Sequence, residues 1–125
     1  MNAQTLLLRQ VHPNFFVDGE VSSQAFYPFP KDSGKLSVYD GDGITPERSY
    51  WHYTRQLGLS SIGVWAVIGA EAESVKLTYL CDPLEGNPHH AVIDFGGGTD
   101  KEYRKLAKQL KRFAADRGCL YQALV

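Results

Sequence analysis

The stretch TDKEYRKLAKQLKRFAADRG, residues 99–118, decides the fold of this chain. Thr99 and Glu102 have the spacing of a capping box, in which each side chain bonds a free backbone N–H at a helix start. Apolar residues then recur at the i, i+3, i+4, i+7 spacing of one helix face. They are Tyr103, Leu106, Ala107, Leu110, Phe113 and Ala114. Because Gly118 is a suitable end, the pattern predicts an amphipathic helix that packs on a β-sheet.

The segments around this helix have the alternating or short apolar patterns of β-strands. The predicted strands are 5–11, 35–41, 59–72, 74–82 and 90–95, with a hairpin at Asp18-Gly19 and a final edge strand within 119–125. The strand 59–72 has a near-continuous apolar centre, so we expect it to be buried in the sheet. We expect 74–82 to pair with it as its antiparallel neighbour.

A second helix is predicted to begin at Thr45, a good N-cap, with Pro46 in the first position. It should end at Gly58, with Tyr50, Tyr53 and Leu57 facing the core. The sequence therefore predicts one α+β domain spanning 1–125. It has a mainly antiparallel sheet of about five to six strands, with two helices packed on one face of it.

Composition limits the class of partner and the compartment. The 125 residues carry a formal net charge of −1, so bulk attraction to nucleic acid or to an acidic membrane is not indicated. Two cysteines without a CxxC pattern, Cys81 and Cys119, predict reduced and mostly buried thiols. Without a signal peptide or an apolar run of membrane length, the chain is expected to be cytoplasmic and to have no membrane partner.

The last predicted helix has the strongest charge pattern. Seven of the thirteen lysine and arginine residues lie between 101 and 117. Six fall within an arc of about 120° opposite the apolar stripe, namely Lys101, Arg104, Lys105, Lys108, Lys111 and Arg112. Such a face can bind an anionic partner, or it can be the solvated side of an amphipathic helix. A smaller cationic patch is predicted at Arg48, His52 and Arg55, where the same alternative holds.

Candidate catalytic residues lie where predicted strands begin and end. They are His12, His90, Ser23, Ser37 and Asp40. Histidine titrates near neutral pH and is the first choice for proton transfer, and a nearby serine or aspartate would complete a site. Ordinary surface histidines are the alternative. Neither a zinc spacing nor a cofactor motif is recognisable, so we expect no metal and no cofactor.

The segment SVYDGDGITPE, residues 37–47, raises the question of a calcium loop. With Gly43 at loop position 6, positions 1 and 12 are Val38 and Ser49, which are not calcium ligands of an EF-hand. The acidic residues Asp40 and Asp42 therefore predict a strand-to-helix turn. A hard cation held with partners from elsewhere in the chain is the alternative.

Three segments, DGEVSSQAFYP, KLSVYDGDGIT and NPHHAVIDF, resemble a group of short uncharacterised bacterial proteins. The group shares a serine–alanine–phenylalanine segment, an LSV strand and a P-x-H-A segment, and no established activity carries over. The resemblance implies a bacterial cytosolic source. It also implies that Ser22 should be tested together with the candidates Ser23, Ser37, Asp40 and His90. A weaker similarity to ADP-ribosyl-transferring folds rests on Arg9 or His12 in the first strand.

These observations favour a small binding domain that recognises an acidic or phosphate-bearing partner through the basic helix face. That partner would be a nucleotide, a nucleic acid or an acidic protein. The alternatives are a cofactor-independent hydrolase or transferase acting on a nucleotide or nucleic acid, and an inhibitor or immunity-type protein. For the last of these, an exposed Trp51 would be informative.

Overall fold

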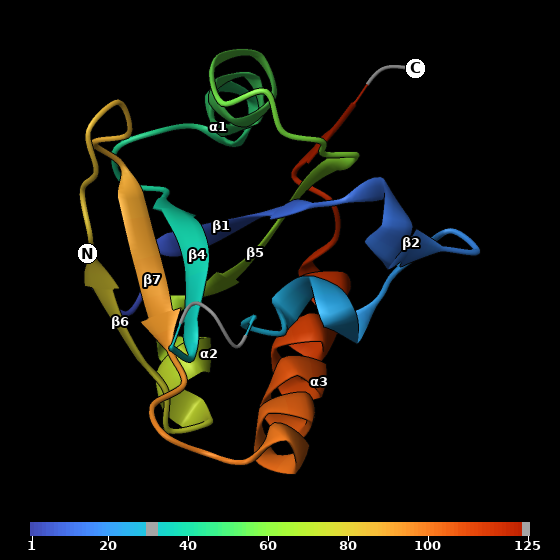
Figure 1. Ribbon diagram of the computed structural model, residues 1–125, viewed down its shortest axis with the longest axis vertical. Helices are drawn as coiled ribbons and strands as arrows, with labels where there is room; N and C mark the ends of the chain where they lie inside the picture. The colour runs from blue at the N-terminus through green and yellow to red at the C-terminus, as the bar shows by residue number, and fades with distance from the viewer. Residues whose placement is uncertain (30–32, 124–125) are drawn as a thin grey trace.

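Six strands form one antiparallel sheet in the computed structural model, which describes residues 1–29 and 33–123 (Figure 1). The sheet order is β6-β7-β4-β1-β5-β8, and a two-stranded hairpin, β2–β3, stands apart from it. The strands are β1 Leu6–Val11, β2 Phe16–Val17, β3 Glu20–Val21, β4 Lys35–Asp40, β5 Gly63–Ile68, β6 Thr78–Cys81, β7 His90–Asp94 and β8 Tyr121–Gln122. The helices are α1 Pro46–Trp51, α2 Gly69–Ser74 and α3 Asp100–Arg117. The predicted α+β fold is confirmed.

The ends of the two longer helical segments follow the predicted chemistry. The Thr99 hydroxyl accepts from the backbone N–H of Glu102 at 3.2 Å, and the Glu102 carboxylate accepts the N–H of Thr99. The Thr45 hydroxyl caps α1 in the same way. Beyond α1 the chain continues as a π-helical turn, His52–Gln56, which reaches Gly58 at a φ of +69°.

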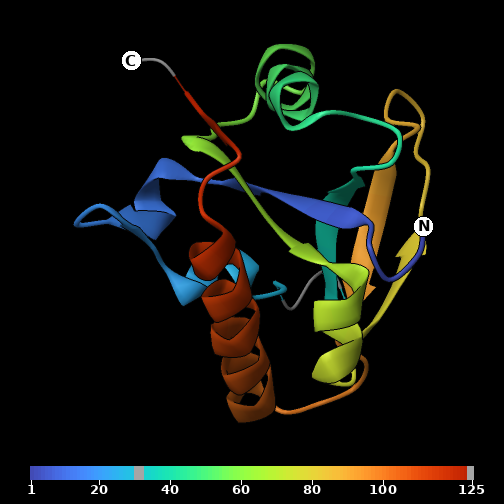
Figure 2. The ribbon, with the colours of Figure 1, turned by 180° about the vertical axis from the view of Figure 1, so that it is seen from behind.

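The two faces of the sheet are both apolar, and each is covered by a different helix. Leu7 belongs to the core that includes Leu110 of α3, whereas Leu8 belongs to a second core with Tyr50 of α1. Figures 1 and 2 show α1 and α3 on opposite sides of β1 and β5. The prediction that both helices share one face is therefore wrong. The reason lies in the three consecutive leucines of β1. Neighbouring residues of a strand point to opposite faces, so these leucines make both faces of the sheet apolar.

The predicted neighbour of β5 is also wrong. Instead of one strand over 59–72, β5 ends at Ile68 and the segment GAEAES forms α2. This segment is rich in helix formers, and the Glu71 carboxylate accepts the Ile68 N–H at 2.8 Å. The chain then crosses to the far edge of the sheet, where β6 pairs with β7.

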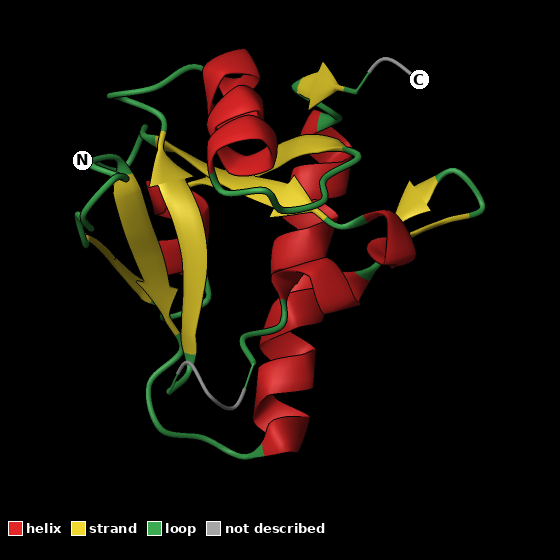
Figure 3. Cartoon of the chain, turned by 45° about the horizontal axis from the view of Figure 1, so that its top comes forward, coloured by secondary structure: helices red, strands yellow, loops and turns green. Residues whose placement is uncertain are grey.

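The hairpin β2–β3 turns at Asp18-Gly19 as predicted, and it projects to one side of the sheet (Figure 3). After it, the short 3₁₀ turn Ser23–Phe26 (η2) packs against α3. Arg9 of β1 holds this turn through a bond from its Nε to the Ala25 carbonyl at 2.7 Å.

Two further predictions concern the thiols and the membrane. Cys81 and Cys119 are free and exposed, so the prediction that they are mostly buried is wrong. Cys81 lies on the edge strand β6, which has a neighbour on one side only. Among the described residues, every helix is too short or too polar to span a bilayer.

Candidate active site

A cavity of about 330 Å³ opens where β1 and β4 separate. The two strands pair only at Leu7 with Asp40 and at Leu8 with Tyr39. Beyond these pairs, the Arg9 side chain fills part of the space and donates from its Nη1 to the Ser37 carbonyl at 2.8 Å. The cavity is lined by β1 and β4, by the segment after α1, by the 84–87 turn and by His90.

Register brings three side chains together beside this cavity. Ser37 on β4 faces Val92 on β7, and His90 faces Tyr39, so Ser37 and His90 point to the same side of the sheet. The Ser37 Oγ lies 3.1 Å from the His90 Nε2. The His90 Nδ1 lies 2.8 Å from the Asp82 carbonyl oxygen and 3.3 Å from the Asp82 carboxylate. The result is a serine–histidine–aspartate arrangement.

The hydrogen-bond partners assign the protons of this arrangement. A carbonyl oxygen only accepts, so the His90 Nδ1 must carry the proton that it shares with Asp82. In the neutral imidazole, Nε2 is then the acceptor, and the Ser37 hydroxyl donates to it. This is the orientation in which a histidine can take the proton of a serine nucleophile.

Two polar side chains lie close to this group. Asn87 lines the cavity and is 7% exposed as a whole residue. Since no buried side-chain nitrogen or oxygen within 1–29 and 33–123 lacks a hydrogen-bond partner, its side-chain amide is not a buried unsatisfied group. Asn87 is tied to His90 through the backbone, because the His90 N–H donates to the Asn87 carbonyl. Tyr39 donates its hydroxyl to the His52 Nδ1 at 2.8 Å, and burial raises the pKa of Tyr39 far above its ordinary value.

Ser37 and His90 are the two predicted catalytic residues that the structure brings together. His12 caps a short turn, where its Nδ1 accepts from the Asn14 N–H at 3.0 Å and its ring packs on Phe15. Ser23 lies on the other side of the molecule, beside Lys108 and Lys111 of α3.

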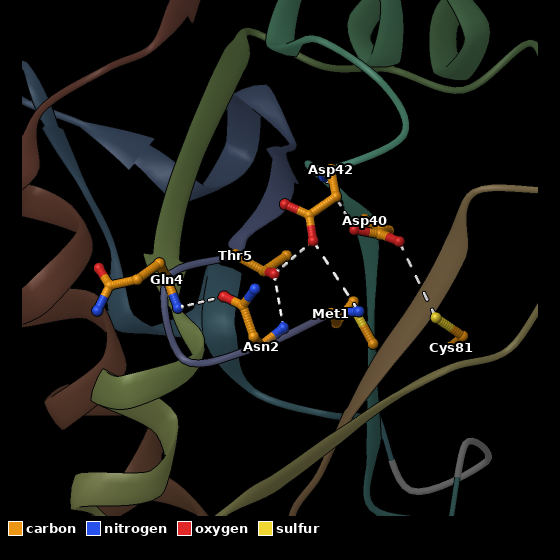
Figure 4. Close-up of polar contacts among 7 residues, drawn as sticks. All are labelled: Met1, Asn2, Gln4, Thr5, Asp40, Asp42 and Cys81. Carbon is orange, nitrogen blue, oxygen red and sulfur yellow. Dashed lines mark hydrogen bonds and ion pairs between the residues drawn. The ribbon is translucent and has the colours of Figure 1, made fainter.

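The remaining catalytic candidate, Asp40, points to the other face of β4 and holds the turn after that strand. Its carboxylate accepts from the Asp42 N–H at 2.9 Å, and Cys81 lies 3.9 Å away. Asp42 in turn accepts the hydroxyl proton of Thr5 and lies near the amino group of Met1 (Figure 4). These hydrogen bonds hold the turn, and no group of three metal-binding side chains occurs in the part of the chain that is described.

The smaller cationic patch is not assembled as helical spacing predicts. His52 faces inward, with its Nδ1 bonded to Tyr39 and its Nε2 bonded to the Gly86 carbonyl at 2.7 Å. The Arg55 guanidinium lies over the Trp51 ring at 3.9 Å. Arg48 is exposed. Ligand binding by these three residues stays a prediction, and His52 is already engaged within the molecule.

The basic face of α3 is largely intact. Arg104 pairs with Asp100 in the first turn, and Arg117 pairs with Glu71 of α2 and bonds the Ala66 carbonyl. The other cations have no ion pair with any residue of 1–29 and 33–123. They are Lys101, Lys105, Lys108, Lys111 and Arg112.

Asp82, Asn87 and the cavity itself were not predicted from the sequence. Their signal was present in CDPLEGNPHH, where proline and glycine predict a tight return that brings residue 82 back toward residue 90. In the structure the chain makes such a return, with a bridge between Leu84 and Asn87. Leu57 is a further correction, because it lines the cavity and is 43% exposed instead of facing the core.

No family model, curated protein or solved structure matches this chain. The resemblance to short bacterial proteins therefore stays a prediction, and the arguments that follow rest on the geometry of the described residues.

Proposed function

We propose that this protein is a serine hydrolase that cleaves esters, with Ser37 as the nucleophile. The observation that carries the proposal is the 3.1 Å contact from the Ser37 Oγ to the His90 Nε2, made while Asp82 engages the opposite ring nitrogen. Such groups are recognised by geometry and by the role of each member, and they recur on unrelated folds. The arrangement needs neither a metal nor a cofactor.

The reaction follows from the proton positions. The Ser37 oxygen attacks the ester carbonyl carbon while the His90 Nε2 takes the hydroxyl proton. The bond from that carbon to the alcohol oxygen then breaks, and the alcohol leaves with the proton from His90. Water attacks the acyl-serine, again giving a proton to His90, which returns it to Ser37 as the acid is released. The sum is ester plus water to acid plus alcohol.

Two other residues have supporting roles in this proposal. Asp82 accepts the Nδ1 proton of His90, which fixes the tautomer and stabilises the imidazolium formed during attack. Asn87 lines the cavity and offers its side-chain amide as a donor to the ester oxygen on which charge develops. The His90 side chain is 12% exposed, and both of its ring nitrogens are engaged before any substrate binds.

The experiment combines a covalent probe with turnover. A fluorophosphonate forms a phosphorus–oxygen bond to an activated serine and releases fluoride, so it should label Ser37, as peptide mass spectrometry would detect. Hydrolysis of p-nitrophenyl acetate should be lost in Ser37→Ala and in His90→Gln. Ser23→Ala is the matched control, because Ser23 lies outside the cavity. Unlabelled Ser37 in folded protein would reject the proposal.

A second candidate function is binding of a phosphate-bearing partner by the basic face of α3. It is favoured by the five cations of that face that have no ion pair with a described residue. Titration of a short single-stranded oligonucleotide at 50 mM salt tests it, since phosphate contacts give an affinity that falls steeply with salt. Both proposals place the protein in the cytoplasm, where free thiols stay reduced.

A further inference from the structure

Exposed apolar side chains gather around the cavity that contains Ser37. Four large hydrophobic residues at its edge are each between 43% and 50% exposed, namely Phe29, Leu57, Leu59 and Leu84. We call this set the apolar rim. Leaving such side chains in water costs free energy, and a cluster of them around a concave site is typical of ligand binding.

The rim is assembled from three separate parts of the chain. Phe29 follows the Ser23–Phe26 turn, Leu57 and Leu59 follow the π-helical turn, and Leu84 is in the return before β7. A π-helical turn is uncommon and occurs often at functional sites. Here it ends at Gln56, and the chain then bends at Gly58, which has a positive φ and lies between Leu57 and Leu59.

The position of the rim relative to the polar groups defines what it can contact. Ser37 and His90 come from β4 and β7, the sheet floor beneath the rim, and Asn87 lines the cavity close in sequence to Leu84. A molecule that occupies the cavity can therefore place a polar carbonyl against the sheet and an apolar portion against the leucines. The cavity volume of about 330 Å³ is near the lower limit for small-molecule sites.

We infer that the substrates are esters of short apolar carboxylic acids, with the acyl chain held by the apolar rim. This inference rests on the proposed function, because it assigns the substrate class of the Ser37 site. The rim contacts the chain in both the bound substrate and the transition state, so added methylenes raise kcat/KM until the small cavity is filled. Long chains extend into water and gain nothing more.

The test is a chain-length series of p-nitrophenyl esters from acetate to decanoate. Burying one methylene is worth about 0.8 kcal/mol, so kcat/KM should rise about two- to fourfold per added methylene over the first members. The rise should stop before the longest esters. Leu59→Ser and Leu84→Ser should flatten this dependence, because each removes apolar surface that the acyl chain contacts.

Leu80→Ser is the matched control for these variants. Leu80 is a 45% exposed leucine on the edge strand β6 and does not line the cavity. Its substitution should leave the chain-length dependence unchanged. A chain-length dependence that the rim variants retain, or that Leu80→Ser also removes, would overturn the inference.

The outcomes separate this inference from the proposal on which it rests. Fluorophosphonate labelling of Ser37 together with equal rates for all esters would keep the hydrolase and reject the acyl-chain assignment. Unlabelled Ser37 and no hydrolysis would reject both, because the assigned substrate class requires turnover. Labelling with a chain-length rise that is lost in Leu84→Ser and kept in Leu80→Ser would support both.

Discussion

The α1 side of the sheet and the outer side of α3 offer two different surfaces to a ligand. On the α1 side, a small concave site combines Ser37, His90 and the Asn87 side chain with exposed leucines. On α3, cations project from one helix face over residues 101–112. The first surface depends on the register of strands distant in sequence, and the second depends only on local helical spacing. Single substitutions should therefore affect the first surface strongly and the second gradually.

The largest effect is expected for Ser37→Ala, because this change removes the nucleophile while keeping the strand. Ester hydrolysis should fall by about 10³-fold or more, to the residual level that binding alone supplies. The free energy of unfolding should change by less than about 1 kcal/mol, because Ser37 is exposed. Turnover of p-nitrophenyl acetate and urea denaturation measure the two effects. If Ser37→Ala lost the folded state together with activity, the prediction that Ser37 acts in catalysis and not in stability would be wrong.

Asn87→Ala should have the next largest effect. Removal of one donor to a developing oxyanion costs about 10²–10³-fold in kcat, with KM changed much less, because the amide acts in the transition state. Asn87→Gln keeps a donor and should recover part of the loss. If Asn87→Ala and Asn87→Gln lowered kcat equally, or if only KM changed, Asn87 would not be a donor to the oxyanion. It would then only line the cavity.

Much of the fold could be predicted because its signals are local. The capping box at Thr99, the Thr45–Pro46 start and the turn at Asp18-Gly19 each depend on residues within four positions. Strand order could not be predicted in this way. GAEAES ends β5 and sends the chain to the opposite edge, and no local pattern specifies the β6–β7 pairing.

The candidate site could be predicted only in part, because strand pairing is not specified by local sequence. Ser37 and His90 could be selected as residue types on strands, but their contact depends on the pairing of β4 with β7. Asp82 contributes both its backbone carbonyl and its carboxylate, and only the first is independent of residue type. The three leucines of β1 predict a strand without showing that both of its faces are covered.

The two ion pairs of α3 give a comparison within one helix. Arg117 donates from both terminal nitrogens to the Glu71 carboxylate, at 2.8 and 3.1 Å, and the pair is mostly buried. Arg117→Met should lower the free energy of unfolding by about 1–3 kcal/mol, because Glu71 is left without its partner. Arg104→Met removes an exposed pair with Asp100 and should cost less than about 1 kcal/mol. Urea unfolding of both variants measures the difference, and equal costs would contradict the role of burial.

The smallest effect is expected on the basic face. Lys105→Gln combined with Lys108→Gln should weaken oligonucleotide binding by about three- to tenfold at low salt. It should also reduce the slope of log affinity against log salt by about 1.5 to 2, because two phosphate contacts are lost. Fluorescence anisotropy at several salt concentrations measures both quantities. Hydrolysis should be unaffected, because neither Lys105 nor Lys108 lines the Ser37 cavity. If hydrolysis fell with these lysines, the two surfaces would act on one ligand, and the separation between a charged outer face and a catalytic cavity would be wrong.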